Sequence, residues 1–252
     1  MLLIGCVAGI GWLLTAADFE LDAASLEVSG IQYTDSAAVT AILAPAVSDG
    51  KSVFLIDTSS LRDELLGLPT VATADVRAVL PHRLIVDITE RVPVLALRQG
   101  LQVYLVDGDG VVLDERQADA PGLAGLRVID DRRVSVAIAY APGDAINRDD
   151  AVAMLTLAAL SPTLLGSSAT ALTVSVDDTH GYVVSAAPYG WLAVFGHYTP
   201  TLRPPTEIDR QVQCLETILA NGEQLLDTIY LAPQGDRCGT YLPLPTVSPS
   251  PS

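Results

Sequence analysis

The sequence predicts an α+β protein in which an apolar N-terminal segment precedes two small domains. Residues 1–17 carry no charged side chain. Residues 24–92 then follow the order strand, helix, helix, strand, strand, which is typical of a small sheet with helices on one face. From residue 93 to residue 239, short alternating strands and glycine-containing turns dominate, with a few helices between them. We therefore expect a mostly antiparallel β-domain with helices after the small domain.

The N-terminal segment is predicted to be a transmembrane helix. It reads MLLIGCVAGIGWLLTAA and ends before the first charged residue, Asp18. A helix of this length spans about 25 Å, slightly less than a hydrocarbon core of about 30 Å. Because no basic residue precedes it, we expect the natural N-terminus to lie further upstream. The alternative is a cleaved signal peptide with Thr15-Ala16-Ala17 as its small-residue site, although that too normally has a basic start.

The charge of the chain excludes some partners. The net charge is −16, and the sequence contains one lysine, Lys51. A nucleic-acid-binding surface needs clustered Lys and Arg to replace phosphate counterions, and adsorption to anionic lipid also needs basic side chains. We therefore expect neither nucleic acid nor an anionic lipid surface as a ligand of the folded domains.

Three cysteines, Cys6, Cys214 and Cys238, leave the disulfide question open. An odd number is a poor disulfide framework, and Cys6 lies in the apolar N-terminal segment. Cys214 and Cys238 either pair outside the cytoplasm or are two separate thiols, one of them facing a core.

The elements of the small domain follow from capping residues and prolines. Ser, Thr and Asp cap helices, and Gly and Pro end helices and strands. The expected elements are a strand ending at Gly30, a helix from the caps at 34–36 to Pro45, a helix from the caps at 57–60 to Pro69, and strands over 71–80 and 83–92.

The second domain is predicted from apolar alternation and turn signals. The segment Asp107-Gly108-Asp109-Gly110 lies between apolar runs, which favours a hairpin turn over a fragment of a calcium loop, because a calcium loop needs further acidic residues. The other expected elements are strands over 94–97, 103–106, 111–113, 172–176, 182–186 and 191–195, helices over 147–160 and 206–220, and a last strand over 225–231. Residues 240–252 are rich in Pro and Ser and are expected to be disordered.

An ordered set of phrases gives the chain a family resemblance. The phrases are LEVSGI, FLIDTSSLRDELLGLPTVATADVRAVLPHRLIVDITERVPVLAL and YLVDGDGVVL. Together they resemble the FtsQ/DivIB family of bacterial cell division proteins across residues 26–113. The positions that match the family pattern are Gly30, Pro69, Val71, Ala74, Val76, Leu80, Pro81, Leu84, Ile85, Val86, Glu90, Arg91, Pro93, Asp107 and Gly110.

The resemblance implies a domain plan and a function. Residues 1–17 would be the anchor, 24–92 a POTRA domain, 93–239 an FtsQ-type β-domain and 240–252 a disordered tail. The family implies a single-pass membrane protein of the division septum, with its domains outside the cytoplasm and with neither cofactor nor enzymatic activity. Its partners would be FtsB/DivIC-like and FtsL-like proteins, and it would help to recruit and regulate septal peptidoglycan synthesis. The alternative is a POTRA-containing module for secretion or envelope protein assembly.

The residues themselves give little support for catalysis or metal binding. His82, His180 and His197 have no zinc-ligand spacing, so no metal site and no catalytic residue is predicted. The segment Glu90-Arg91-Val92-Pro93 is either functional or, as we expect, a structural strand end at the domain border.

The predicted partner-binding site is a sheet edge. The resemblance implies that the partner adds a strand to the last strand of the β-domain, where unpaired backbone groups are available. That strand is predicted to be Thr228-Ile229-Tyr230-Leu231-Ala232, with Tyr230 as the main side-chain contact. The alternative is a strand buried within the sheet, with Tyr230 as packing. A weaker second surface is the edge of the POTRA sheet over residues 74–80.

Overall fold

The computed structural model describes residues 19–48, 51–118, 123, 125–134, 139–201, 203–235 and 237–245. The chain divides into two compact units, Met1–Val92 and Pro93–Ser252. The predicted transmembrane segment, residues 1–17, lies outside the described residues. Among the residues that the structure describes, no helix combines the length and apolar character that a bilayer-spanning segment needs.

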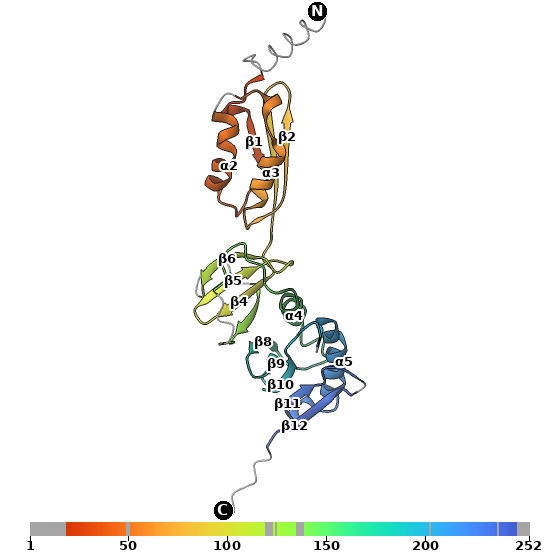
Figure 1. Cartoon of the computed structure of the whole chain (residues 1–252). Coiled ribbons are helices and arrows are strands. Elements are labelled where there is room, and N and C mark those ends of the chain that lie inside the picture. Colours follow the sequence, from red (N-terminus) through yellow and green to blue (C-terminus); the bar gives the residue numbers. More distant parts are fainter. Residues whose placement is uncertain are drawn as a thin grey trace, which may run out of the picture. The chain divides into compact units, whose positions relative to one another are not determined.

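The first unit is a three-stranded sheet packed against two helices, as predicted (Figure 1). The strand order is β1-β3-β2, in which β1 pairs with β3 in parallel and β2 pairs with β3 antiparallel. Its core consists of alternate strand residues and one stripe of each helix, and includes Leu43, Leu65, Leu84 and Val86. The elements are β1 (Leu26–Ser29), α2 (Ser36–Ser48), α3 (Thr58–Leu66), β2 (Val71–Val79) and β3 (Arg83–Glu90), with short 3₁₀ turns at Ala23–Ser25 and Val53–Leu55.

Helix α2 differs from the prediction at its C-terminal end. Pro45 was expected to stop this helix, but it lies inside α2, which continues to Ser48. A proline in the last turn removes only one backbone hydrogen bond. Ala46 is buried and Val47 packs against the core, so the burial of this turn compensates for the missing bond.

The second unit is built on one nine-stranded sheet with the order β12-β11-β10-β9-β8-β7-β4-β5-β6 (Figure 1). Most pairings are antiparallel, as predicted, whereas β4–β7, β7–β8 and β10–β11 are parallel. Two of these parallel pairs have a crossover helix, α4 or α5, between their strands, because parallel neighbours need a long connection. The elements are β4 (Leu95–Gln99), β5 (Gln102–Val106), β6 (Val112–Gln117), β7 (Arg127–Asp131), α4 (Arg148–Ala158), β8 (Ala171–Asp177), β9 (Gly181–Ala187), β10 (Leu192–Gly196), α5 (Ile208–Leu219), β11 (Leu226–Leu231) and β12 (Gly239–Pro243), with 3₁₀ turns at Pro205–Glu207 and Glu223–Leu225.

One face of this sheet carries the main core. Trp191, Tyr182 and Phe195 are fully buried there, together with Met154 of α4 and Leu215 of α5. A smaller apolar cluster covers the opposite face of β4, β5 and β6, with Leu123 and Leu126 packed against it. Along β10 the burial alternates, so that Leu192 and Val194 lie on the face away from the helices.

The turn at Asp107–Gly110 connects β5 to β6, as predicted. The Asp107 carboxylate accepts hydrogen bonds from the backbone N–H groups of Asp109 and Val111, at 3.0 and 2.8 Å. The carboxylate is therefore directed at its own turn, and the described residues contain no group of three acidic, His or Cys side chains able to hold a metal ion.

A buried ion cluster joins β7 to the start of α4. The Arg133 guanidinium contacts Asp131 at 2.8 Å and Asp150 at 2.9 Å, and its side chain is only 8 % exposed. Tyr182 of β9 donates to Asp150 at 2.9 Å, and Gln99 of β4 donates to Asp131 at 3.1 Å. Although burial works to lower the pKa of Arg133, the two carboxylates raise it, so the guanidinium stays charged.

The C-terminal segment corrects two predictions. Residues 239–243 form β12, which pairs antiparallel with β11, so the prediction of disorder from residue 240 is wrong for this stretch. The predicted last strand, 225–231, is therefore not the last one. Tyr241 and Leu242 favour strands, and Pro243 stands at the strand end, where its missing N–H does little harm. Residues 246–252 lie outside the described residues.

Candidate partner-binding site

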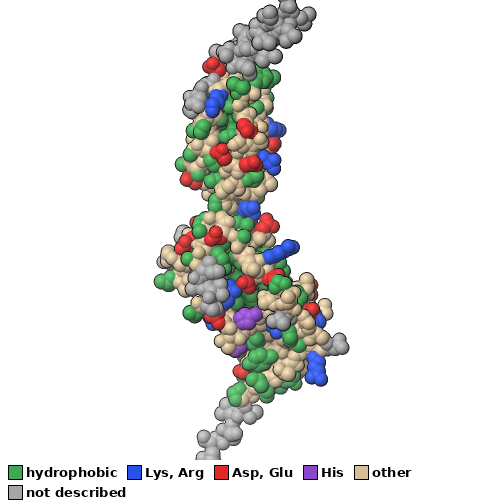
Figure 2. Space-filling view, viewed as in Figure 1, with side chains coloured by type: hydrophobic (Ala, Val, Ile, Leu, Met, Phe, Trp, Pro, Cys, Tyr) green, Lys and Arg blue, Asp and Glu red, His purple; other side chains and the backbone are tan. Residues whose placement is uncertain are grey.

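Strand β12 is the end of the sheet at which backbone groups are available. No described strand pairs with its outer side. All five of its residues are exposed, and its sequence, GTYLP, contains no charge. An uncharged, exposed edge strand is a template for a strand from another chain. Figure 2 shows apolar side chains at the end of the second unit that carries β11 and β12.

The pairing with β11 determines which backbone groups of β12 point outward. Ala232 N–H donates to the Cys238 carbonyl at 3.0 Å, which makes 232 and 238 a hydrogen-bonded pair. Such pairs alternate along an antiparallel ladder, so Thr240 and Leu242, opposite Tyr230 and Thr228, direct their backbone groups at β11. The N–H and C=O of Tyr241 therefore point away from the sheet.

The loop before β12 is held by α5 at both ends. Arg210 and Gln211 of α5 donate to the Ala232 carbonyl, at 2.9 and 3.3 Å. Cys214 of α5 forms a disulfide with Cys238, with 5.0 Å between the Cα atoms. This settles the alternative left open by the sequence in favour of a pair.

Gly239 allows β12 to approach β11 closely. Its φ is +143°, and a Cβ at this position would collide with the Tyr230 carbonyl. Any other residue would push the first residue of β12 away from its neighbour.

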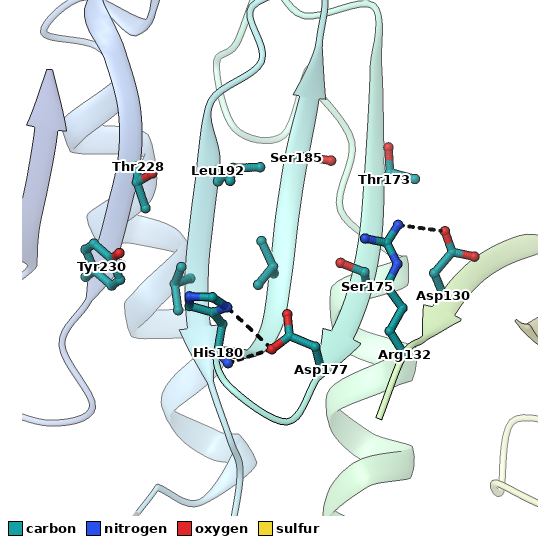
Figure 3. A pocket seen from close by; sticks show the side chains of 12 residues that line it. Asp130, Arg132, Thr173, Ser175, Asp177, His180, Ser185, Leu192, Thr228 and Tyr230 are labelled. Carbon is teal, nitrogen blue, oxygen red and sulfur yellow. Dashed lines mark hydrogen bonds and ion pairs between the residues drawn. The ribbon is translucent and has the colours of Figure 1, made fainter. Parts of the chain in front are cut away.

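A groove of about 380 Å³ lies on the sheet face away from the helices (Figure 3). One end is polar and holds two pairs, Asp177 with His180 at 3.4 Å and Asp130 with Arg132 at 3.5 Å. The other end contains Leu192 and Val194. It lies next to β12, because Thr228 and Tyr230, which line it, belong to β11 and pair with Leu242 and Thr240 of β12. The lining residues are Asp130, Arg132, Thr173, Ser175, Asp177, His180, Val183, Ser185, Leu192, Val194, Thr228 and Tyr230.

The carboxylates of the groove remain ionised at neutral pH. Partial burial works to raise the pKa of Asp177, but backbone N–H groups of His180 and Thr179 donate to it and lower the pKa below its ordinary value. The Arg98 guanidinium lowers the pKa of Asp130 through a direct ion pair. The polar end therefore presents fixed charges to a ligand.

The structure gives residues 228–232, the predicted site, a different position in the sheet from the predicted one. Strand β11 lies between β10 and β12, so the prediction that it forms the sheet edge is wrong. Thr228 and Tyr230 line the groove, Ile229 and Leu231 are buried in the core, and Ala232 follows the strand. Sequence reasoning missed β12, and the available signal was the run Thr240-Tyr241-Leu242 after a glycine.

Glu90, in the family motif, binds the backbone of a distant loop. Its carboxylate accepts hydrogen bonds from the N–H groups of Gln32, Tyr33 and Thr34, at 2.9, 2.9 and 2.7 Å. Burial works to raise its pKa, but these donors lower it to about 2. Arg91 donates from its backbone N–H to Thr70 at 2.8 Å. Both contacts lie within the first unit, which supports a structural role for the motif.

The other motif positions are also structural. Gly30 has a φ of +85°, and a Cβ there would collide with the Ile88 carbonyl. Val71, Ala74 and Val76 are buried in the first core. Pro69 precedes β2, Pro81 lies in the turn between β2 and β3, and Pro93 begins the second unit. Of the histidines, His82 and His197 are exposed, and only His180 lies in the groove.

Comparisons with known proteins agree with the resemblance. Residues 22–91 match the model of the FtsQ-type POTRA domain. The chain is 32 % identical to cell division protein FtsQ of Novosphingobium aromaticivorans over 122 residues, which are 46 % of this chain and 38 % of that protein. It is 28 % identical to FtsQ of Koribacter versatilis over 123 residues, 45 % of this chain and 35 % of that protein. It is 21 % identical to cell division protein DivIB of Clostridium tetani over 70 residues, 28 % of this chain and 26 % of that protein. The match thus spans less than two fifths of each relative's length.

Proposed function

We propose that the chain, whose residues 22–91 match the FtsQ-type POTRA domain, is a member of the FtsQ/DivIB family of cell division proteins and a non-enzymatic scaffold of the divisome. It is held in the cell membrane by the single apolar segment 1–17, with both folded units outside the cytoplasm at the division septum. It binds FtsB/DivIC-like and FtsL-like membrane proteins, and through them helps to recruit and regulate septal peptidoglycan synthesis.

The observation that carries this proposal is the edge of β12. A partner strand placed beside β12 meets the N–H and C=O groups of Tyr241 and no charged side chain. Main-chain hydrogen bonds then supply affinity, and alternate side chains supply specificity. Because Thr240 and Leu242 lie opposite Tyr230 and Thr228, partner residues on that face continue towards the groove.

The partner's chemistry follows from this surface. An extended, largely apolar segment suits the exposed side chains of Tyr241, Leu242 and Leu244. Residues that flank the added strand would cover Leu192 and Val194 in the groove. Thr228–Ala232, which the sequence singled out, thus contribute a supporting strand and two groove residues to the proposed site, and β12 is the strand that pairs.

The test is a binding titration of the full chain in detergent against the extracytoplasmic segment of the FtsB/DivIC-like protein of the same cell. Tyr241→Pro removes the outward N–H and leaves the ladder with β11 intact, since proline is tolerated at such edge positions. We expect binding to fall by about 100-fold, because the variant loses one main-chain hydrogen bond and the tyrosine side chain, each equivalent to about tenfold in affinity.

Tyr241→Ala is the matched control, because it removes the same side chain and keeps the backbone donor. It should weaken binding by only about tenfold or less. Equal affinity of Tyr241→Pro and wild type, with circular dichroism showing a folded variant, would remove β12 as the site. Absence of binding by the wild-type chain would refute the partner assignment.

A further inference from the structure

The side chains of β12 contribute little to holding this strand in the sheet. All five residues of β12 are exposed, so the strand buries no side chain in the core. By contrast, β11 next to it contributes Leu226, Ile229 and Leu231 to that core. Backbone pairing alone is a weak hold for a terminal strand, because it leaves out the apolar burial that stabilises most strands.

One covalent bond stands immediately before this strand. Cys238 directly precedes Gly239, the first residue of β12, and its disulfide partner Cys214 is buried on the core side of α5. On the far side of β12, one backbone bond follows, from Leu244 N–H to the Leu225 carbonyl at 2.9 Å. The disulfide is thus the strongest connection between β12 and the folded core among the described residues.

We infer that the Cys214–Cys238 disulfide is a redox-controlled clamp that keeps β12 in register, so that partner binding at this edge is strong in the oxidised protein and weak in the reduced one. The clamp itself is a property of this chain. The binding consequence rests on the proposed function.

The chemistry of release needs an external dithiol. A thiolate of the dithiol attacks one sulfur of the cystine, which forms a mixed disulfide and releases the other cysteine as a thiolate. The second thiol of the dithiol then attacks the mixed disulfide and displaces the cysteine that was attacked first. Two electrons and two protons pass to the protein, which ends with two thiols, and the dithiol ends as a disulfide. Cys238 is the more exposed of the two cysteines and is the expected point of attack.

Hydrogen exchange measures the clamp without any partner. The full chain carries Cys6→Ser, so that only the paired cysteines remain, and is compared in its oxidised form and in dithiothreitol. We expect the amides of β12 to exchange at least about tenfold faster after reduction, because the strand now opens locally. The amides of β9, in the middle of the sheet, should not change.

The double variant Cys214→Ser/Cys238→Ser should reproduce the reduced pattern in the absence of reductant, and the dithiol should then have no further effect. Unchanged protection of β12 on reduction would overturn the inference. So would an equal loss of protection in β9, because the disulfide would then support the whole unit instead of one strand.

A binding titration separates the two claims. With a cysteine-free extracytoplasmic segment of the FtsB/DivIC-like protein, we expect the Kd to rise about tenfold on reduction and to recover on reoxidation. Faster exchange of β12 with an unchanged Kd would overturn the redox control of binding. If the oxidised chain does not bind, the proposed function fails, and the exchange result still decides whether the clamp exists.

Discussion

The two edge strands of the nine-stranded sheet, β6 and β12, differ in how their outward backbone groups are protected. Strand β6 carries Asp114, Glu115 and Arg116, with Arg116 and Asp114 paired at 2.8 Å. Its first residues are covered by residues 143–145, since Val112 N–H donates to Asp144 and Gly143 N–H donates to Val112. Strand β12 has no charged residue, and no other described strand lies along its outer side.

Natural sheets discourage unwanted strand pairing with charges and with covering loops. Both devices are present on β6, and among the described residues neither is present on β12. The contrast supports the proposal that the exposed edge of β12 binds a partner strand, because the other edge of the same sheet is protected. The difference extends to stability, since the half of the sheet near β6 is supported by the Arg133 cluster and the β12 end by a single disulfide.

The largest effect is expected from Arg133→Met in the protected half. The substitution leaves Asp131 buried and without its cation, which destabilises by about 3–5 kcal/mol. Urea unfolding followed by Trp191 fluorescence measures this for the second unit. The control is Arg132→Met, whose side chain is 67 % exposed and pairs with Asp130 at 3.5 Å, and which should change stability by less than about 1 kcal/mol. Similar values for the two variants would mean that the cluster does not support this half.

A second prediction concerns the first unit, where the Glu90 carboxylate accepts hydrogen bonds from three backbone N–H groups. The outward N–H of β12, by contrast, pairs with no described strand. Glu90 has a pKa of about 2 in the folded protein against 4.5 in the unfolded chain. A depressed carboxyl pKa stabilises the fold fully above pH 4.5, and this stabilisation is lost as the pH falls towards 2. Glu90→Gln should therefore lower the stability of the first unit by about 2 kcal/mol at pH 7, and the difference from wild type should shrink below pH 4.

Hydrogen exchange of β3 at pH 7 and pH 3 measures this difference. Glu27→Gln is the control, because Glu27 forms an exposed ion pair with Arg83. That variant should behave like wild type at both pH values. A Glu90→Gln effect of the same size at pH 3 as at pH 7 would show that the hydrogen bonds, rather than the ionised carboxylate, matter.

The smallest effect is expected when a charged residue, of the kind that β6 carries, is introduced into β12. Leu242→Lys places a charge on the open edge, beside the groove, and should raise the Kd for the partner segment about tenfold without changing stability. Leu164→Lys is the matched control, since Leu164 is exposed to a similar extent in a loop and should bind like wild type. A normal Kd for Leu242→Lys would show that charge alone does not close this edge.

The sequence predicted the elements of the first unit well, because each has local signals. The Asp57 side chain caps α3 as expected, and the proline-bounded strands β2 and β3 lie where alternation placed them. The Glu90 contacts were out of reach, because they join residues that lie 56–58 positions apart in the chain.

The candidate site could be predicted only in part. Tyr230 lies on a strand, as predicted, but whether that strand is an edge depends on the segment that follows it in the sequence. The Pro- and Ser-rich composition of residues 240–252 concealed the short strand at its start. The disulfide depends on the approach of α5 to a loop, with 24 residues between the two cysteines, and no local pattern encodes that approach.

The disulfide also decides where mechanical tension goes. Residues 214–238 form a closed covalent ring that contains β11 and most of the loop before β12. A pull on β12 along its axis would reach Cys238 and pass in part through the sulfur bridge into α5, whose Leu215 is fully buried. The backbone path back to β11 shares the load with this bridge, so β11 does not carry the whole of a pull on the last strand.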